Sequence, residues 1–94
     1  MFEIRKGENG SWALCGRLDA ARAEALLDEF ASIPPSCVID LRDLEYISSA
    51  GLGLLFAAHK RLSDTGGGLR LVNLRPHIRE LFAIAGFDKI FALE

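Results

Sequence analysis

Two adjacent hydroxyls, Ser48 and Ser49, lie in the segment YISSAGLGLL at residues 46–55, where an extended stretch gives way to an apolar run with helical spacing. A helix start uses one capping hydroxyl, so the second is available for other chemistry. A serine at a strand-to-helix turn could be the nucleophile of a hydrolase, or it could accept a phosphoryl group. The neighbouring residues distinguish these two chemistries.

The hydrolase interpretation is disfavoured by the residues around the serines. A nucleophile elbow has the spacing G-x-S-x-G, whereas Tyr46 and Ile47 stand two residues before the two serines. The candidate bases are His59 and His77, and nothing in the sequence indicates that either approaches a serine. We therefore expect no catalytic residue and predict that the chain is not an enzyme.

The remaining reactive side chains predict neither a metal site nor a cofactor. Cys15 and Cys37 lie in apolar, strand-like runs, without a Cys or His neighbour at a metal-ligand spacing, so we expect buried, reduced thiols. The glycines at 66–68 precede a strand and lack the Lys-Ser/Thr of a phosphate-binding loop. They predict a turn.

Length, charge and hydropathy restrict the classes of protein to consider. The 94 residues are half hydrophobic and carry 11 basic against 13 acidic side chains, which is typical of one soluble domain spanning residues 1–94. There is no basic cluster, so we expect no direct nucleic-acid partner. No window approaches about 18 apolar residues, so we expect no membrane insertion and a cytoplasmic location.

The pattern of apolar residues predicts a β-hairpin followed by alternating helices and strands. Asp19 is a favoured N-cap for the first helix, Pro34 and Pro35 end that helix, and its apolar positions include Leu27. The expected elements are hairpin strands at 2–6 and 11–18 around GENG, a helix at 20–33, a strand at 37–41, a helix at 49–62, a strand at 69–74, a helix from Pro76 to a C-cap at Gly86, and a strand at 89–93.

This order predicts an α/β fold with a mixed, mostly parallel sheet. The hairpin should form one edge of the four to five strands, and about three helices should connect the parallel ones. Residues 42–46, RDLEY, are expected to carry the chain from the third strand to the serines.

A helical count at about 100° per residue assigns different directions to the two serines. Ser49 falls on the face opposite the apolar residues, whereas Ser48 points back toward the packed side. Phe56 lies on the same outward face as Ser49, so we expect it to be substantially exposed and Leu55 to be buried. The outward face carries Ser49, Gly53, Phe56 and Lys60, and we interpret it as a docking surface.

Phosphorylation of Ser49 is compatible with the fold and adverse to a complex. A phosphate adds about −1.5 to −2 charge at a helix N-terminus, where the helix dipole tolerates an anion. A partner closing over Ser49 and Phe56 would have to bury or oppose that charge. A penalty of about 3 kcal/mol would weaken binding more than a hundredfold.

Several motifs in this order resemble a STAS domain of the anti-sigma factor antagonist type. They are GRLDA at 16–20, VIDL at 38–41, YISSAGLGLL at 46–55 and LRLVNLRPHIRELFAIAGFDKIF at 69–91, and together they cover nearly the whole chain. The resemblance implies a small bacterial regulator that binds an anti-sigma factor and thereby releases a sigma factor. That partner is also a serine kinase, it phosphorylates the antagonist at the start of the second helix, and a phosphatase reverses the modification.

The resemblance assigns roles to individual residues. The family segment often reads Asp-Ser-Ser/Thr-Gly-Leu-Gly, and with Gly51 aligned its acid falls on Ser48, its first hydroxyl on Ser49 and its second on Ala50. Ser49 is therefore the expected phosphorylation site, ahead of Ser48, and Asp19 matches the acid of the family's Gly-x-Leu-Asp turn. The expected partner-binding residues are Asp19, Ser48, Ser49, Gly53, Phe56 and Lys60.

A second function stays open at this point. STAS accessory subunits bind the ATPase of lipid-type ABC transporters without phosphorylation, and their Thr-Ala-Gly-Leu segment resembles SSAGL at 48–52. Neighbouring kinase or phosphatase genes would support the regulator, and permease and ATPase genes would support the transporter subunit.

Overall fold

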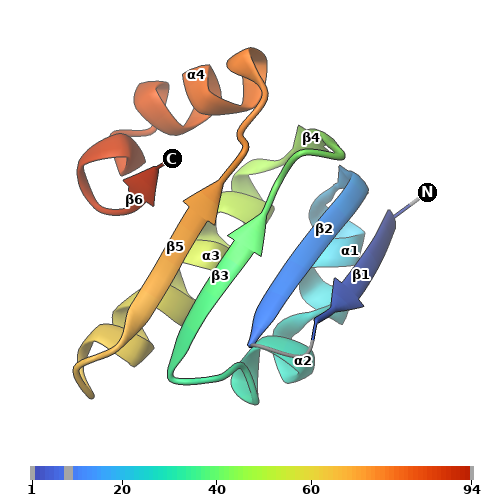
Figure 1. The fold of residues 1–94 in the computed structure, drawn as a ribbon. Helices are drawn as coiled ribbons and strands as arrows, with labels where there is room; N and C mark the ends of the chain where they lie inside the picture. Colours follow the sequence, from blue (N-terminus) through green and yellow to red (C-terminus); the bar gives the residue numbers. More distant parts are fainter. Residues whose placement is uncertain (1, 8–9, 94) are drawn as a thin grey trace.

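The sheet is built on two hairpin strands, to which the other strands are added in parallel. The computed structural model describes residues 2–7 and 10–93. Strand β1 (Phe2–Lys6) pairs antiparallel with β2 (Ser11–Leu18), while β2, β3 (Ser36–Asp40), β5 (Gly68–Val72) and β6 (Ala92–Leu93) follow in parallel. This arrangement confirms the predicted mixed sheet with a hairpin edge (Figure 1). The tip of the predicted turn, residues 8 and 9, lies outside the described residues.

One short strand, β4 (Leu44–Ile47), was not predicted. The second half of β2 pairs in parallel with β4, whereas its first half pairs with β3. The two halves meet at a bulge beside Gly16, whose φ of 95° is in the left-handed region that glycine tolerates. Residues expected only to connect two elements therefore form a sixth strand of the described sheet.

The helices lie mainly on one face of the sheet. Figure 1 shows α1 (Ala20–Ala25), α2 (Leu27–Ala31) and α3 (Ser49–Ser63) behind the strands, and α4 (Pro76–Ile84) near the end where β5 finishes. Pro76 is in the first turn of α4, and Gly86 follows the C-cap with a φ of 79°. The predicted start of α4 is confirmed, whereas its C-cap is Ala85, one residue before the predicted Gly86.

The predicted helix at 20–33 is wrong in one respect, because it is interrupted at Leu26. Leu26 has φ −92° and ψ −2°, and the chain changes direction between α1 and α2. The second segment turns Phe30 into the core, where it meets the Trp12 ring edge-on at 5.3 Å. Leu27, assigned by periodicity to the apolar face, is instead 59% exposed.

The predicted strand at 89–93 is also largely wrong. Residues Phe87–Lys89 form a 3-10 turn, η1, and only Ala92 and Leu93 pair with β5. Aromatic packing accounts for the turn, because it brings the Phe91 ring to 5.8 Å from Phe82 and 6.1 Å from Phe87.

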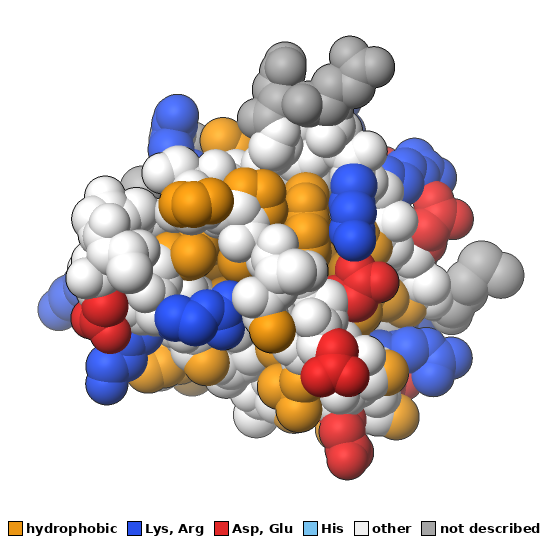
Figure 2. All heavy atoms as spheres, turned by 90° about the horizontal axis from the view of Figure 1, so that it is seen from below, with side chains coloured by type: hydrophobic (Ala, Val, Ile, Leu, Met, Phe, Trp, Pro, Cys, Tyr) orange, Lys and Arg blue, Asp and Glu red, His pale blue; other side chains and the backbone are white. Residues whose placement is uncertain are grey.

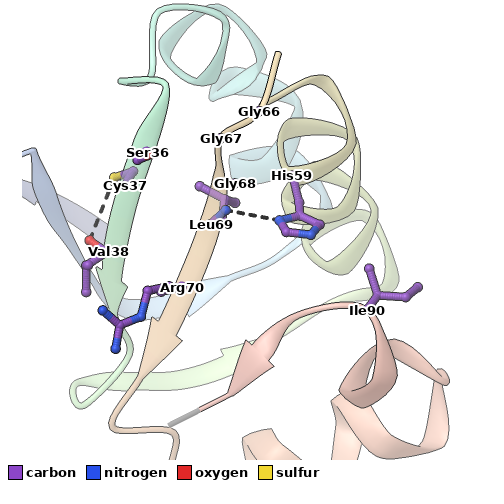
Figure 3. A pocket seen from close by; sticks show the side chains of 10 residues that line it. All are labelled: Ser36, Cys37, Val38, His59, Gly66, Gly67, Gly68, Leu69, Arg70 and Ile90. Atoms are coloured by element: carbon purple, nitrogen blue, oxygen red, sulfur yellow. Dashed lines mark hydrogen bonds between the residues drawn. The ribbon is translucent and has the colours of Figure 1, made fainter. Parts of the chain in front are cut away.

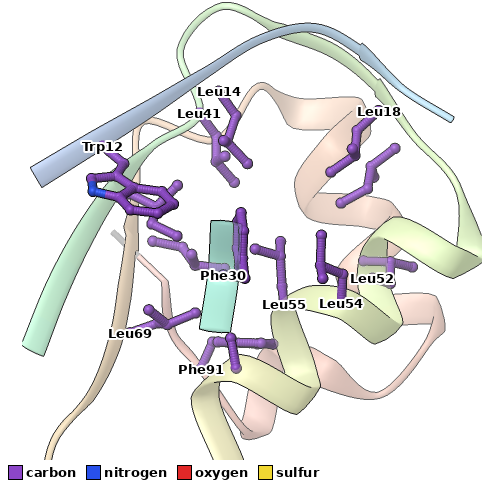
Figure 4. Packing of buried hydrophobic residues seen from close by; sticks show 14 of the residues in the cluster. Trp12, Leu14, Leu18, Phe30, Leu41, Leu52, Leu54, Leu55, Leu69 and Phe91 are labelled. Atoms are coloured by element: carbon purple, nitrogen blue, oxygen red, sulfur yellow. The ribbon is translucent and has the colours of Figure 1, made fainter. Parts of the chain in front are cut away.

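A single hydrophobic core fills the space between the sheet and the helices. Figure 4 shows side chains of β2 and β5 meeting those of α3, with the Phe30 ring between them. Leu55 is fully buried, as predicted. The largest fully buried side chains are Phe30, Phe82, Leu14, Leu18, Ile39, Leu41, Leu44, Leu55, Leu69, Leu71 and Ile78.

The surface carries charges of both signs. Figure 2 views the molecule from below, and Lys and Arg side chains are scattered there among Asp and Glu side chains and hydrophobic ones. Among the described residues, no helix combines the length and the apolar character that crossing a membrane requires.

Candidate functional site

Two helices begin side by side at the ends of two neighbouring strands. Leu18 of β2 pairs with Ile47 of β4, and the Ser48 N–H donates to the Leu18 carbonyl at 2.9 Å. The residues that follow these strand ends are Asp19, the N-cap of α1, and Ser48, the N-cap of α3. Parallel pairing of β2 and β4 therefore brings together two positions that are far apart in the sequence.

Ser48 is used as a helix cap. Its side-chain oxygen accepts the Gly51 N–H at 3.1 Å, which satisfies one of the amide groups that a helix start leaves without a partner. The side chain is half-buried. This geometry confirms that Ser48 caps, and it gives the hydroxyl a structural partner.

Ser49 is the first residue of α3 and is exposed. The helical count is confirmed for Ser49, which is exposed, whereas Ser48 is half-buried. A phosphate at this position would extend from the positive end of a 15-residue helix. The structure thus provides an accessible hydroxyl, and its modification stays a prediction.

Gly51 and Gly53 differ although they are two residues apart. A Cβ on Gly51 would lie 2.8 Å from Ile47 Cγ1 and 3.0 Å from Leu18 Cγ, so close packing against β2 and β4 requires glycine there. A Cβ on Gly53 would meet nothing within 4 Å, and Gly53 is exposed. Packing within the chain therefore explains the first glycine and leaves the second unexplained.

The expectation that Phe56 is substantially exposed is wrong. Its ring stacks on Phe87, with centroids 5.4 Å apart and planes at 17°, and the side chain is half-buried against the core. Phe87 comes from η1, which is distant in sequence from α3, so the helical count could not include it. The aromatic part of the predicted docking surface is thus partly covered by the chain itself.

The opposite flank of α3 borders a groove that sequence reasoning missed. It has a volume of about 390 Å³ and separates α3 from α1 and the start of α2. The exposed Leu27 stands at its rim, and the available signal was the run of small residues on both helices. The lining residues are Ala20, Ala23, Glu24, Leu27, Ala50, Gly53, Leu54 and Ala57.

A second cavity does not resemble an anion site. It measures about 540 Å³ and lies beside the glycine loop, as Figure 3 shows. The Gly67 and Gly68 amides donate to the carbonyls of Leu62 and Pro35, and the Leu69 amide donates to Nδ1 of His59 at 3.0 Å. These amides are therefore engaged within the chain, which agrees with the predicted turn.

The histidines form hydrogen bonds within the chain, and the cysteines are free thiols in the sheet. His59 accepts the Leu69 amide, and Nε2 of His77 lies 2.8 Å from the Glu45 carbonyl. Both cysteines are free thiols, but only Cys37 is fully buried, and burial raises its pKa to about 11. Cys15 is half-buried, so the prediction of a buried thiol holds for it only in part, and desolvation raises its pKa too.

Comparison with known proteins decides the family. The family model described as "Mlab, STAS domain" matches residues 3–93. The chain belongs to the STAS-domain family. This STAS domain is 43% identical over 82 residues to the "Putative anti-sigma factor antagonist BtrV" of Bordetella bronchiseptica, covering 83% of the chain and 71% of that relative. It is 28% identical over 92 residues to the anti-sigma-B factor antagonist of Bacillus subtilis, covering 94% and 84%.

A solved structure shows the same fold. The anti-sigma factor antagonist SpoIIAA in its unphosphorylated form superposes with a TM-score of 0.78 at 19% identity, covering 100% of this chain and 88% of SpoIIAA. The predicted α/β fold of the STAS type is therefore confirmed.

The structure places the predicted partner-binding residues of this STAS domain in three settings. Asp19, Ser48 and Ser49 lie at the starts of α1 and α3, where β2 and β4 end. Gly53 and Lys60 are exposed further along α3, and Phe56 is covered in part by Phe87. Their role in binding a partner stays a prediction.

Proposed function

We propose that the chain is an anti-sigma factor antagonist controlled by phosphorylation of Ser49. In its unmodified form it binds an anti-sigma factor that is also a serine kinase, and phosphate on Ser49 disrupts that complex. A serine phosphatase restores the binding form. The proposal makes the chain a cytoplasmic binding regulator and not an enzyme.

The observation that carries this proposal is the exposed Ser49 hydroxyl at the start of α3, beside a second hydroxyl that is already used. Ser48 holds the Gly51 amide, and Ala50 has no hydroxyl to offer. Ser49 is thus the acceptor that a kinase can reach at this helix start. The anti-sigma names of the two relatives described above support the same class of function.

Charge explains how modification could control binding. Asp19 and Ser48, the N-caps of α1 and α3, follow paired strand ends, so a phosphate on Ser49 would add its charge at the edge of the sheet that also carries Asp19. A partner surface that fits the neutral hydroxyl would have to desolvate or oppose about two negative charges. The fold would tolerate the same phosphate, since the helix N-terminus favours an anion.

The alternative of a transporter subunit is not favoured. The two relatives described above carry the names of anti-sigma factor antagonists, and nothing in the geometry of the described site singles out a transporter ATPase as the partner.

Mass spectrometry after incubation with the cognate kinase and ATP tests the proposal. We expect one phosphate on Ser49 of the wild-type chain and none on Ser49→Ala. Ser63→Ala is the matched control, because Ser63 is exposed at the other end of α3 and its substitution should leave incorporation unchanged. Undiminished incorporation in Ser49→Ala would refute the site assignment.

A binding measurement completes the test. Ser49→Asp should weaken binding to the kinase by tenfold or more, on the basis of about 1.4 kcal/mol per factor of ten. Ser49→Ala should bind as the wild type does. Equal affinity of Ser49→Asp and the wild type would contradict control by charge at this position.

A further inference from the structure

The groove between α1 and α3 is an apolar feature next to the proposed modification site. Ala50, which follows Ser49 directly, lines one end of it, and Ala57 lines it two turns further along α3. The wall opposite α3 is formed by α1 and by Leu27 at the start of α2. Its length therefore runs along α3, away from Ser49.

Gly53 lies in the middle of this groove and makes it deeper than any other residue would. Beyond its two chain neighbours and the backbone of its own helix, no described atom lies within 4 Å of the place that a Cβ would take, so packing does not require glycine there. Glycine disfavours a helix interior, and it allows another backbone or a bulky side chain to approach closely. The open space at Gly53 is thus suited to an incoming group.

The rim of the groove offers an apolar contact and one charge. Leu27 is 59% exposed, although it is a large hydrophobic side chain. Glu24 is the charged residue among those that line the groove, and the ion pairs found among the described residues involve Glu3 and Glu29 instead. The carboxylate of Glu24 is therefore available to a cation on a partner.

We propose that this groove receives a segment of the anti-sigma kinase in which a bulky apolar side chain is accompanied by a Lys or Arg. The apolar side chain lies over Gly53 against Leu27, and the cation pairs with Glu24. The inference rests on the proposed function and specifies the chemistry of the partner surface. The single carboxylate of Glu24 next to an apolar floor suits such a peptide and opposes the head group of an anionic lipid.

The position of the groove connects this docking mode to phosphorylation. A segment that fills the groove as far as Ala50 ends next to the start of α3, where Ser49 is exposed. A hydrated phosphate there obstructs the end of the groove and does not change its floor. The phosphate on Ser49 and the residues of the groove therefore affect the same complex, the first by obstructing the end of the groove and the second by contacting the partner.

Isothermal titration of the purified anti-sigma kinase encoded nearest to this chain, with ATP absent, tests the inference. Filling the groove with Gly53→Leu should weaken binding at least about tenfold, and Glu24→Lys and Leu27→Ala should each weaken it several-fold. The matched controls lie on the exposed side of α4: Ala83→Leu, Glu80→Lys and Ile84→Ala, each of which should bind as the wild type does.

Gly53→Ala is a second variant that separates a loss of binding from a loss of folding. It adds one methyl group to open space and favours the helix, so weaker binding together with an unchanged or higher Tm would assign the effect to the groove. If the wild type binds the kinase and is phosphorylated on Ser49 while all groove variants bind like their α4 controls, the docking mode is wrong and the proposed function stands. If the wild type neither binds the kinase nor accepts phosphate, the proposed function fails, and the inference fails with it.

Discussion

The two flanks of α3 differ in what covers them. On one flank, Phe56 is stacked under Phe87, and the aromatic cluster continues to Phe91. On the other flank, Gly53 faces a groove, and beyond its chain neighbours and its own helix backbone no described atom comes within 4 Å of the point where a Cβ would stand. The first flank is closed by the chain itself, and the second is available to another molecule. Exposure along a helix is therefore set by its neighbours as well as by its own period.

The glycines make the same contrast at shorter range. Gly51 is required by the contacts that a Cβ would make with Ile47 and Leu18, whereas Gly53 has no such requirement. A glycine inside a helix lowers stability by about 0.5–1 kcal/mol relative to alanine. At Gly51 this loss is offset by close packing against β2 and β4. At Gly53 no such packing exists among the described residues, and we attribute the presence of glycine there to the binding of a partner.

The largest expected loss of stability comes from a substitution in the aromatic cluster that covers the closed flank. Phe91→Ala removes a buried ring that contacts His59, Phe82 and Phe87, and it should lower the free energy of unfolding by about 3–5 kcal/mol. Leu27→Ala on the open flank should change it by about 0.5 kcal/mol or less. Urea denaturation measures both. Similar losses for the two variants would show that the flanks do not differ as described.

The two glycine substitutions should act in opposite directions. Gly51→Ala forces a methyl group against Ile47 and Leu18, so we expect a loss of about 1–3 kcal/mol, reduced in part by the better helix propensity of alanine. Gly53→Ala should raise the free energy of unfolding by about 0.5–1 kcal/mol. Thermal denaturation of both variants beside the wild type measures the two changes. A lower stability of Gly53→Ala would mean that the methyl group meets other atoms and that the groove is not open at this position.

The smallest effect separates the two serines. Ser48→Ala removes the acceptor of the Gly51 amide and should lower stability by about 1 kcal/mol, whereas Ser48→Asp should retain the cap. Ser49→Ala should stay within about 0.5 kcal/mol of the wild type. Chemical denaturation of the three variants measures these changes. If Ser49→Ala lost as much stability as Ser48→Ala, the Ser49 hydroxyl would have a structural role in addition to the proposed modification.

The elements with strong local patterns were predicted correctly. The hairpin, α3, β5 and α4 each combine a clear period with a cap or a turn residue, and these signals depend on neighbours in sequence. The strand β4 was missed because four residues carry little periodicity and its pairing with β2 is nonlocal. The break at Leu26 and the 3-10 turn at 87–89 follow from how Phe30 and Phe91 pack, which no local pattern reports.

The candidate site was predicted in its polar part and missed in its apolar part. Asp19 was recognised as a cap from its position, Ser48 was placed toward the packed side, and Ser49 was placed outward by the helical count. The groove escaped prediction because its two walls come from different helices, and Leu27 was assigned to the buried face.

The sequence by itself determined the register of α3, because an N-cap and a period of about 100° per residue are properties of a few consecutive residues. It therefore decided which serine caps and which one is exposed. The tertiary structure alone decided that Phe56 is covered and Gly53 is open, because Phe87 and α1 reach α3 only through the folding of the whole sheet. Contacts between distant segments are a property of the packed core, and they determine which exposed residues can meet a partner.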